Sequence, residues 1–131
     1  MSEDIDKQFV AAARSWIGTP WVHQGRARHG VDCIGLVVMA AADCGLDVTM
    51  DATYGHTQAY WQAKPLLLEF CERVSGGGEG IVALYKNTSI LHVGVLTESN
   101  TVVHAFGPAG RVVESGLNFE PLQFWRPRWA I

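Results

Sequence analysis

One cysteine carries the residue type and the sequence setting that nucleophilic catalysis requires. Cys33 follows Asp32 and precedes an apolar run over residues 34–44 that contains no proline and ends at Gly45. The run predicts a helix that Asp32 caps and that Gly45 terminates. Unpaired N–H groups at the start of a helix stabilise a thiolate. We therefore expect the pKa of Cys33 to lie below that of a free cysteine.

Two histidines are candidates for the base and for the group that orients it. Both can come from parts of the sequence distant from the cysteine. His92 lies in an apolar segment over 90–97, and His104 lies in another over 101–106. Both segments predict short strands, and the polar residues between them predict an antiparallel hairpin. The sequence does not fix the register of this hairpin, and we assume that both imidazoles face the same side of the sheet.

Four short segments resemble the NlpC-type cysteine peptidases in their order and spacing. They are Gly-Thr-Pro-Trp-Val-His-Gln-Gly at 18–25, Asp-Cys-Ile-Gly-Leu-Val at 32–37, Leu-His-Val-Gly-Val at 91–95 and Val-His-Ala at 103–105. The resemblance implies an α+β, minimal papain-like fold. In that fold, N-terminal helices pack on a central antiparallel sheet of about five strands, and the nucleophile begins a helix.

The resemblance implies a role for each of the three reactive residues. By position, Cys33 matches the family's nucleophile, His92 its general base and His104 the residue that orients the base. We therefore expect a cysteine endopeptidase that cleaves amide bonds in peptidoglycan stem peptides through an acyl-enzyme, with no metal or other cofactor. The alternative is that these three are ordinary core residues, because buried cysteines and histidines are common.

The surroundings of the nucleophile differ from the family pattern. Members usually carry tyrosine where this chain has Trp21, and many carry serine where it has Ile34. An indole N–H is then the only donor that residue 21 offers. We assign Trp21, Asp32 and Ile34 to substrate binding and expect the two departures to affect substrate choice.

Within the family, the Gly-Thr-Pro loop and the acidic, polar start of the chain look most like peptidases of phage and gene-transfer-agent tails. We expect synthesis in a bacterial cytoplasm without a signal peptide, association with a virion-like particle, and tail or baseplate proteins as partners. The alternative is a structural hub or plug of such a particle that keeps the peptidase fold while its activity has lapsed or become secondary.

Composition narrows the classes of partner. A chain of 131 residues with 48% hydrophobic residues predicts one globular domain over 1–131. The net charge of −3 gives no electrostatic reason to expect nucleic acid as a partner. No apolar stretch approaches the roughly 18 residues that a membrane span needs.

The other cysteines and histidines predict neither a disulfide framework nor a metal site. Three cysteines are an odd number, and Cys44 and Cys71 are most simply buried apolar residues. A zinc site that combines Cys33 with His23 and His29 is disfavoured because no single helix can align these residues.

The remaining sequence predicts a layer of helices and a run of strands. The first helix starts at Ser2 and ends at Gly18, and residues 18–32 form a loop. Two short helices follow, over 58–64 and from Pro65 to Cys71. The residues expected on one face of the first helix are Ile5, Phe9, Ala13, Trp16 and Ile17. The strands expected in an antiparallel meander lie at 81–86, 90–97, 101–106, 111–114 and 122–126. The aromatic and basic tail at 124–129 predicts a closing edge strand or a docking surface.

Overall fold

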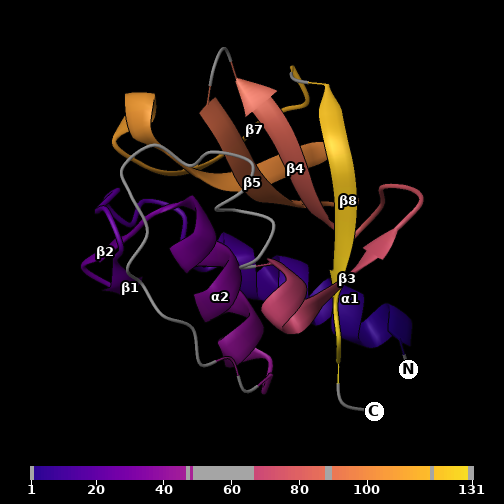
Figure 1. Cartoon of the computed structure of the whole chain (residues 1–131). Helices are drawn as coiled ribbons and strands as arrows, with labels where there is room; N and C mark the ends of the chain where they lie inside the picture. Colours follow the sequence, from indigo (N-terminus) through magenta and orange to yellow (C-terminus); the bar gives the residue numbers. More distant parts are fainter. Residues whose placement is uncertain (1, 47, 49–66, 88–89, 119, 130–131) are drawn as a thin grey trace.

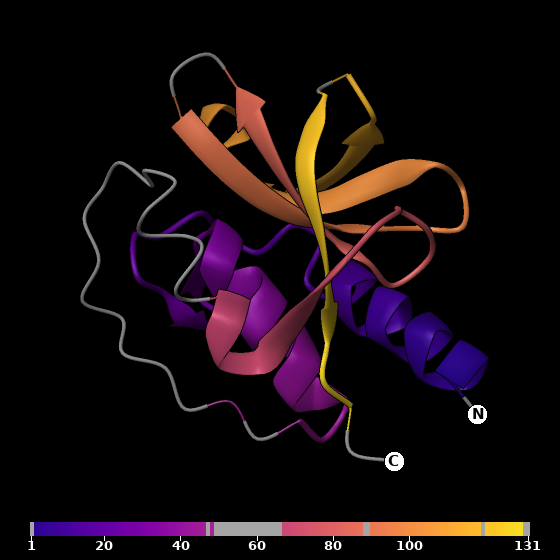
Figure 2. The ribbon, with the colours of Figure 1, turned by 45° about the vertical axis from the view of Figure 1, so that its right-hand side comes forward.

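A layer of helices lies against one antiparallel sheet in the computed structural model (Figure 1). The structure describes residues 2–46, 48, 67–87, 90–118 and 120–129. The helix predicted over 58–64 lies outside these residues. Helices α1 and α2 run together below the sheet, and the view in Figure 2 shows both on that same side. The predicted α+β class is confirmed.

Helix α1 (Ser2–Arg14) begins the chain and buries an apolar stripe. Its core residues Phe9, Val10 and Ala13 are at most 1% exposed, as their three-to-four-residue spacing requires. The helix ends four residues earlier than predicted, and Gly18 then turns the chain with a φ of +93°. Ile17, expected on the buried face, lies beyond the helix end and is 47% exposed, so that expectation was wrong.

Helix α2 (Cys33–Asp43) has the boundaries that its flanking residues predict. The Asp32 carboxylate accepts a 2.7 Å hydrogen bond from the backbone N–H of Gly35, which is the expected N-cap. At the other end Gly45 adopts a φ of +90°, a left-handed conformation that favours glycine. Eight of the eleven helical residues are buried because neighbouring elements cover the helix on several sides.

Six strands form the main sheet in the order β3-β8-β4-β5-β6-β7, one more than expected. They are β3 (Cys71–Val74), β4 (Val82–Asn87), β5 (Ile90–Leu96), β6 (Thr101–Phe106), β7 (Arg111–Gly116) and β8 (Pro121–Pro127). A 3-10 turn, η1 (Gly107–Ala109), joins β6 to β7. Two short paired strands, β1 (Arg26–Ala27) and β2 (Gly30–Val31), lie in the segment that was expected to be loop.

Two expectations about strand placement are corrected. The segment from β4 to β7 is a meander, but β8 returns to lie between β3 and β4 and is not an edge strand. Its Trp125 is 1% exposed, which an interior position explains. Residues 67–70 are helical as predicted, whereas Cys71 begins β3 because it pairs with Pro127 of β8.

The two faces of the sheet have different neighbours. Alternate residues such as Val93, Val95 and Val103 belong to the main core, which also contains the buried residues of α1 and α2. A second, smaller cluster includes Tyr85 and Val102, which alternate with residues of the main core. The side chains that matter for chemistry come from this second face of β4, β5 and β6 and from the first residue of α2.

Candidate active site

The candidate nucleophile lies where α2 meets β5 and β6. Cys33 is the first residue of the helix, as predicted, and it is 4% exposed. The backbone N–H of Val93 in β5 stabilises the thiolate form of Cys33, so it lies against the sulfur. The N–H groups of Cys33 and Ile34 act in the same direction. The helix N-terminus therefore delivers the thiol directly to β5.

The hydrogen-bonding pattern of β5 explains why the N–H of Val93 is available to a sulfur. The Leu96 N–H donates to the Ile81 carbonyl on the β4 side, and the Thr97 N–H donates to the Thr101 carbonyl on the β6 side. Donors alternate along a strand, so the odd-numbered Val93 directs its N–H toward β6. The β5–β6 ladder, however, contains only Val95↔Val103 and Leu96↔Val102. Cys33 therefore approaches β5 beyond the point where this ladder ends.

Burial affects the pKa of the Cys33 thiol more than the helix terminus does, and it raises that pKa. Desolvation, and next the negative charge of Asp32, raise the pKa of Cys33 to about 12. The three backbone N–H groups lower it by less than these effects raise it. The expectation of a pKa below that of free cysteine was therefore wrong, because the sequence revealed the helix start but not the depth of burial.

The two predicted histidines meet directly. Nε2 of His92 and Nδ1 of His104 are 2.9 Å apart, so both rings lie on one side of the sheet, as we assumed. Their exposed fractions are 9% and 1%. Because Nε2 of His92 faces His104, Nδ1 is the nitrogen of His92 that remains outside this hydrogen bond. This is the arrangement that a base and its orienting residue require.

Both imidazoles are neutral in this environment. Desolvation, and next the repulsion from His104, lower the pKa of His92 to about 3. Desolvation lowers the pKa of His104 to about 4. Together with the raised pKa of Cys33, these shifts indicate that the resting groups are a thiol and a neutral imidazole.

Sequence reasoning missed two side chains that hold His104. The hydroxyl of Tyr85 lies 2.7 Å from Nδ1 of His104, and the hydroxyl of Ser115 lies 2.8 Å from Nε2. Tyr85 pairs directly with His92 across β4 and β5, and its ring packs edge-on against that imidazole. Its pKa is raised far above the usual range by burial and then by Cys33, so it is protonated and close to the sulfur. The sequence placed Tyr85 in a predicted strand, and Ser115 lies in the observed strand β7. Only the register of the paired strands shows that both side chains face the histidines.

The three residues assigned to substrate binding occupy different environments. The carboxylate of Asp32 accepts from Gly35 and from the backbone N–H of Gln24 at 2.8 Å, and the side chain is 1% exposed. Ile34 is also 1% exposed and belongs to the core. Trp21 is half-buried and stacks on His23 with ring centroids 6.4 Å apart. Of the three side chains, only Trp21 has substantial exposure, and its role in substrate binding stays a prediction.

Comparison with known proteins identifies the family. The chain is 30% identical over 122 residues to a curated protein of Escherichia coli strain K12, "Probable endopeptidase NlpC". The match covers 88% of this chain and 71% of that protein. The chain belongs to the NlpC/p60 family. The sequence matches no family model, so the assignment rests on this relative.

Solved structures of NlpC/p60 proteins share the fold. The domain of the peptidoglycan hydrolase SagA superposes with a TM-score of 0.63 and 21% identity, covering 91% of this chain and 96% of that one. RipD of Mycobacterium tuberculosis, described as a non-catalytic NlpC/p60 domain adapted to peptidoglycan binding, gives a TM-score of 0.63 at 15% identity and covers 95% and 98%. The family therefore includes both hydrolases and a protein without activity. Among the described residues, no helix has the length and apolar character needed to span a bilayer.

Proposed function

We propose that this NlpC/p60 protein hydrolyses amide bonds in the stem peptides of peptidoglycan, with Cys33 as nucleophile, His92 as base and His104 as the residue that orients His92. The observation that carries the proposal is the 2.9 Å contact between Nε2 of His92 and Nδ1 of His104. The backbone N–H of Val93, the residue after His92 in β5, favours the thiolate form of Cys33 at the start of α2. The curated relative, a probable endopeptidase, supports the reaction class.

The neutral resting pair determines how the reaction starts. Nδ1 of His92 takes the thiol proton of Cys33 as the sulfur attacks the substrate carbonyl, so no free thiolate accumulates beforehand. Backbone N–H groups at the start of α2, with the indole N–H of Trp21, stabilise the oxyanion. The imidazolium then protonates the leaving amine, which departs and leaves a thioester. Water, activated by the same nitrogen, hydrolyses that thioester and restores the thiol.

Digestion of purified peptidoglycan, with mass analysis of the fragments, tests the proposal and identifies the bond. The wild-type protein should release muropeptides cut within the stem peptide, and Cys33→Ala should release none. Cys44→Ala is the matched control, because Cys44 is a half-buried cysteine at the other end of the same helix. Equal turnover by Cys33→Ala and wild type would refute the role of Cys33.

The burial of the sulfur supports a second candidate, a binding module without turnover. Cys33 is 4% exposed, and its pKa of about 12 disfavours a reactive thiolate. RipD is a structural neighbour described as adapted in this way. Such a module would sediment with insoluble peptidoglycan equally well as wild type or Cys33→Ala, and neither protein would release fragments.

We also propose that the protein works as part of a phage-like or gene-transfer-agent tail, where it opens the cell wall or serves as a hub. Support comes from the Gly-Thr-Pro loop at 18–20 and its resemblance to tail peptidases. Immunogold labelling of purified particles tests this setting. Label at the tail tip would support it, and label confined to the cell fraction would contradict it.

A further inference from the structure

His104 is the centre of a hydrogen-bonded row that crosses four strands. Its Nδ1 has two partners, the Tyr85 hydroxyl from β4 at 2.7 Å and Nε2 of His92 from β5 at 2.9 Å. Its Nε2 lies 2.8 Å from the Ser115 hydroxyl of β7. The ring is 1% exposed, so its hydrogen bonds are made within the protein.

A neutral imidazole carries one proton, and its position on His104 decides what His92 can do. If the proton is on Nε2, then Nδ1 of His104 accepts from the Nε2–H of His92, and Nδ1 of His92 holds a lone pair. If the proton is on Nδ1 of His104, that nitrogen can donate to Nε2 of His92. The proton of His92 then moves to Nδ1, and no base remains for the thiol.

We infer that Ser115 is a positioning residue, which stabilises the productive tautomer of His104 by accepting a hydrogen bond from its Nε2–H. The inference rests on the proposed function, because the productive tautomer is defined by the need for a base at Nδ1 of His92. Ser115 touches neither the sulfur nor the scissile bond in this scheme. It acts through two imidazoles.

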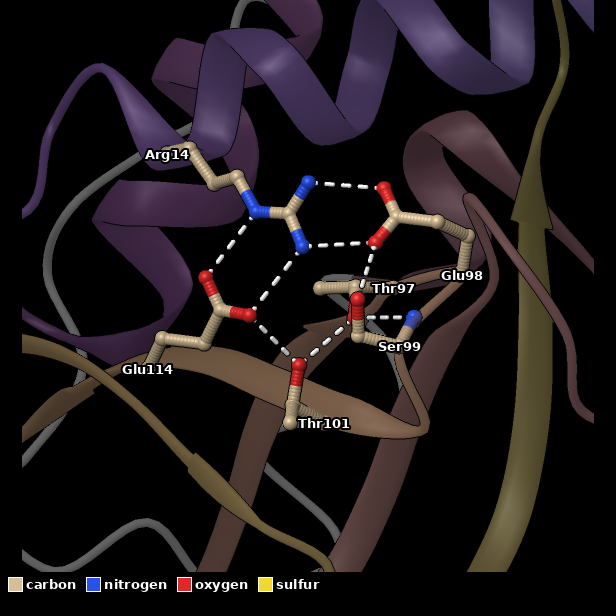
Figure 3. A network of polar contacts seen from close by, with 6 residues as sticks. All are labelled: Arg14, Thr97, Glu98, Ser99, Thr101 and Glu114. Carbon is tan, nitrogen blue, oxygen red and sulfur yellow. Dashed lines mark hydrogen bonds and ion pairs between the residues drawn. The ribbon is translucent and has the colours of Figure 1, made fainter.

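The sheet holds Ser115 in a fixed place for this contact. His104 pairs with Val113, and Ser115 lies two residues further along β7, diagonal to His104 on the same face. The adjacent residue Glu114 faces the other side, where it accepts hydrogen bonds from Arg14 of α1 and from Thr101 of β6 (Figure 3). These contacts fix the strand that presents the Ser115 hydroxyl.

The second hydroxyl in the row, that of Tyr85, does not distinguish the two tautomers of His104. Tyr85 can donate to Nδ1 of His104 or accept from it, so it is compatible with either tautomer. In the hydrogen bond between His92 and His104, either ring can likewise be the donor. The Ser115 hydroxyl can also donate or accept. Its oxygen matters most for the productive tautomer, because without it the buried Nε2–H of His104 would lose its described partner, whereas the other tautomer would leave only a lone pair unpaired at Nε2.

The test compares Ser115→Ala with Ser115→Thr, which retains the hydroxyl. Long-range proton–nitrogen correlation spectra of protein with 15N-labelled histidine, at pH 7, show directly which nitrogen of each ring is protonated. In wild type and Ser115→Thr we expect protons on Nε2 of both His92 and His104. In Ser115→Ala we expect both to move to Nδ1, with kcat reduced roughly 100-fold, the low end of what a positioned general base contributes.

A control on the same network separates positioning from stability. Thr101→Ala removes a hydrogen bond to Glu114 and leaves Ser115 in place, so it should lower the melting temperature without changing the histidine spectra. Unchanged tautomers in Ser115→Ala, or a change that Ser115→Thr reproduces, would overturn the inference. The spectra do not depend on turnover, so a wild-type protein that cleaves nothing would refute the proposed function and still leave the tautomer assignment testable.

Discussion

A Cβ atom added to Gly94 would lie 3.0 Å from the Cβ atom of His104 and 2.5 Å from Cγ2 of Val102. Gly94 lies two residues after His92 in β5, on the same face of the sheet, and the absence of a side chain there leaves room for His104 beside it. We expect Gly94→Ala to lower the free energy of unfolding by about 1–3 kcal/mol, the usual cost of overpacking. It should also reduce peptidoglycan turnover, because the displaced strand separates the two rings.

Urea unfolding and the digestion assay measure both effects of Gly94→Ala. Gly76→Ala is the control, because a Cβ at that exposed position contacts nothing within 4 Å. Gly94→Ala with wild-type stability and turnover would show that β6 adapts without cost.

The reactivity of Cys33 should follow its raised pKa. Because the thiol has a pKa of about 12, the fraction of thiolate rises tenfold per pH unit throughout the neutral and mildly alkaline range. The rate of alkylation by iodoacetamide should therefore rise about tenfold per unit from pH 7 to 10. Mass spectrometry of the Cys33 peptide measures the rate. A plateau below pH 8 would instead indicate a preformed thiolate–imidazolium pair.

Asp32→Asn should separate the two effects of Asp32 on the site. The amide keeps one oxygen that can cap α2, since asparagine and aspartate are equally good caps, but its NH2 group cannot accept the hydrogen bond from the Gln24 N–H. It removes the negative charge, which is one cause of the raised pKa of Cys33. We expect faster alkylation of Cys33 at pH 8 than in wild type, with helix content unchanged by circular dichroism. Asp32→Ala, which loses the cap as well, should lower stability by about 1 kcal/mol or more. Slower alkylation in Asp32→Asn would contradict the electrostatic account.

Acid should destabilise the fold through the two buried histidines. Their pKa values, about 3 and about 4, lie below the value of about 6.5 in an unfolded chain. Below pH 6.5 the unfolded chain therefore binds protons that the folded chain does not. The free energy of unfolding should fall as pH drops, by at most about 1.4 kcal/mol per unit for each histidine. Urea midpoints between pH 7 and 5 measure the slope, and His104→Asn should reduce it.

The two carboxylates that Arg14 contacts, Glu98 and Glu114, contribute at lower pH than the histidines, which separates the two effects. Hydrogen bonds from Arg14 lower the pKa of Glu98 to about 2 and also lower the pKa of Glu114. Both groups stay ionised from pH 7 to 5. A slope in that range that His104→Asn leaves unchanged would show that other groups bind the protons.

Glu114 should stabilise the fold more than Glu98 does. Arg14 donates to both carboxylates, and each accepts from one hydroxyl, Thr101 for Glu114 and Ser99 for Glu98. Glu114 is the less exposed of the two, so water screens its contacts less. We expect Glu114→Gln to lower the free energy of unfolding by about 1 kcal/mol. Glu98→Gln should have a smaller effect that added salt removes. Equal losses for the two variants in thermal melts would contradict this ranking.

The sequence predicted the elements of the candidate site because their signals are local. Asp32 before an apolar run and Gly45 after it mark the ends of α2 through backbone hydrogen bonds and backbone conformation. The hairpin that carries His92 and His104 follows from strand residues on either side of a polar turn. Each of these signals depends on residues only a few positions apart, so capping and turn preferences are enough to predict the element.

The parts that sequence analysis missed depend on contacts between distant residues. Tyr85 and Ser115 join the row only through register across neighbouring strands, which no local pattern fixes. The acidity of Cys33 depends on how deeply other elements bury it, so the helix-terminus argument gave the wrong direction. β8 lies between β3 and β4 because of pairings that span 36 to 56 residues of sequence.

The return of β8 has a consequence for biosynthesis. A ribosome releases β3 to β7 before β8, so β3 and β4 cannot join into one sheet until residues near 127 have emerged. Nascent chains should therefore remain protease-sensitive until β8 has emerged. Because such long-range pairings slow folding, chaperones would have time to engage the exposed edge of β4.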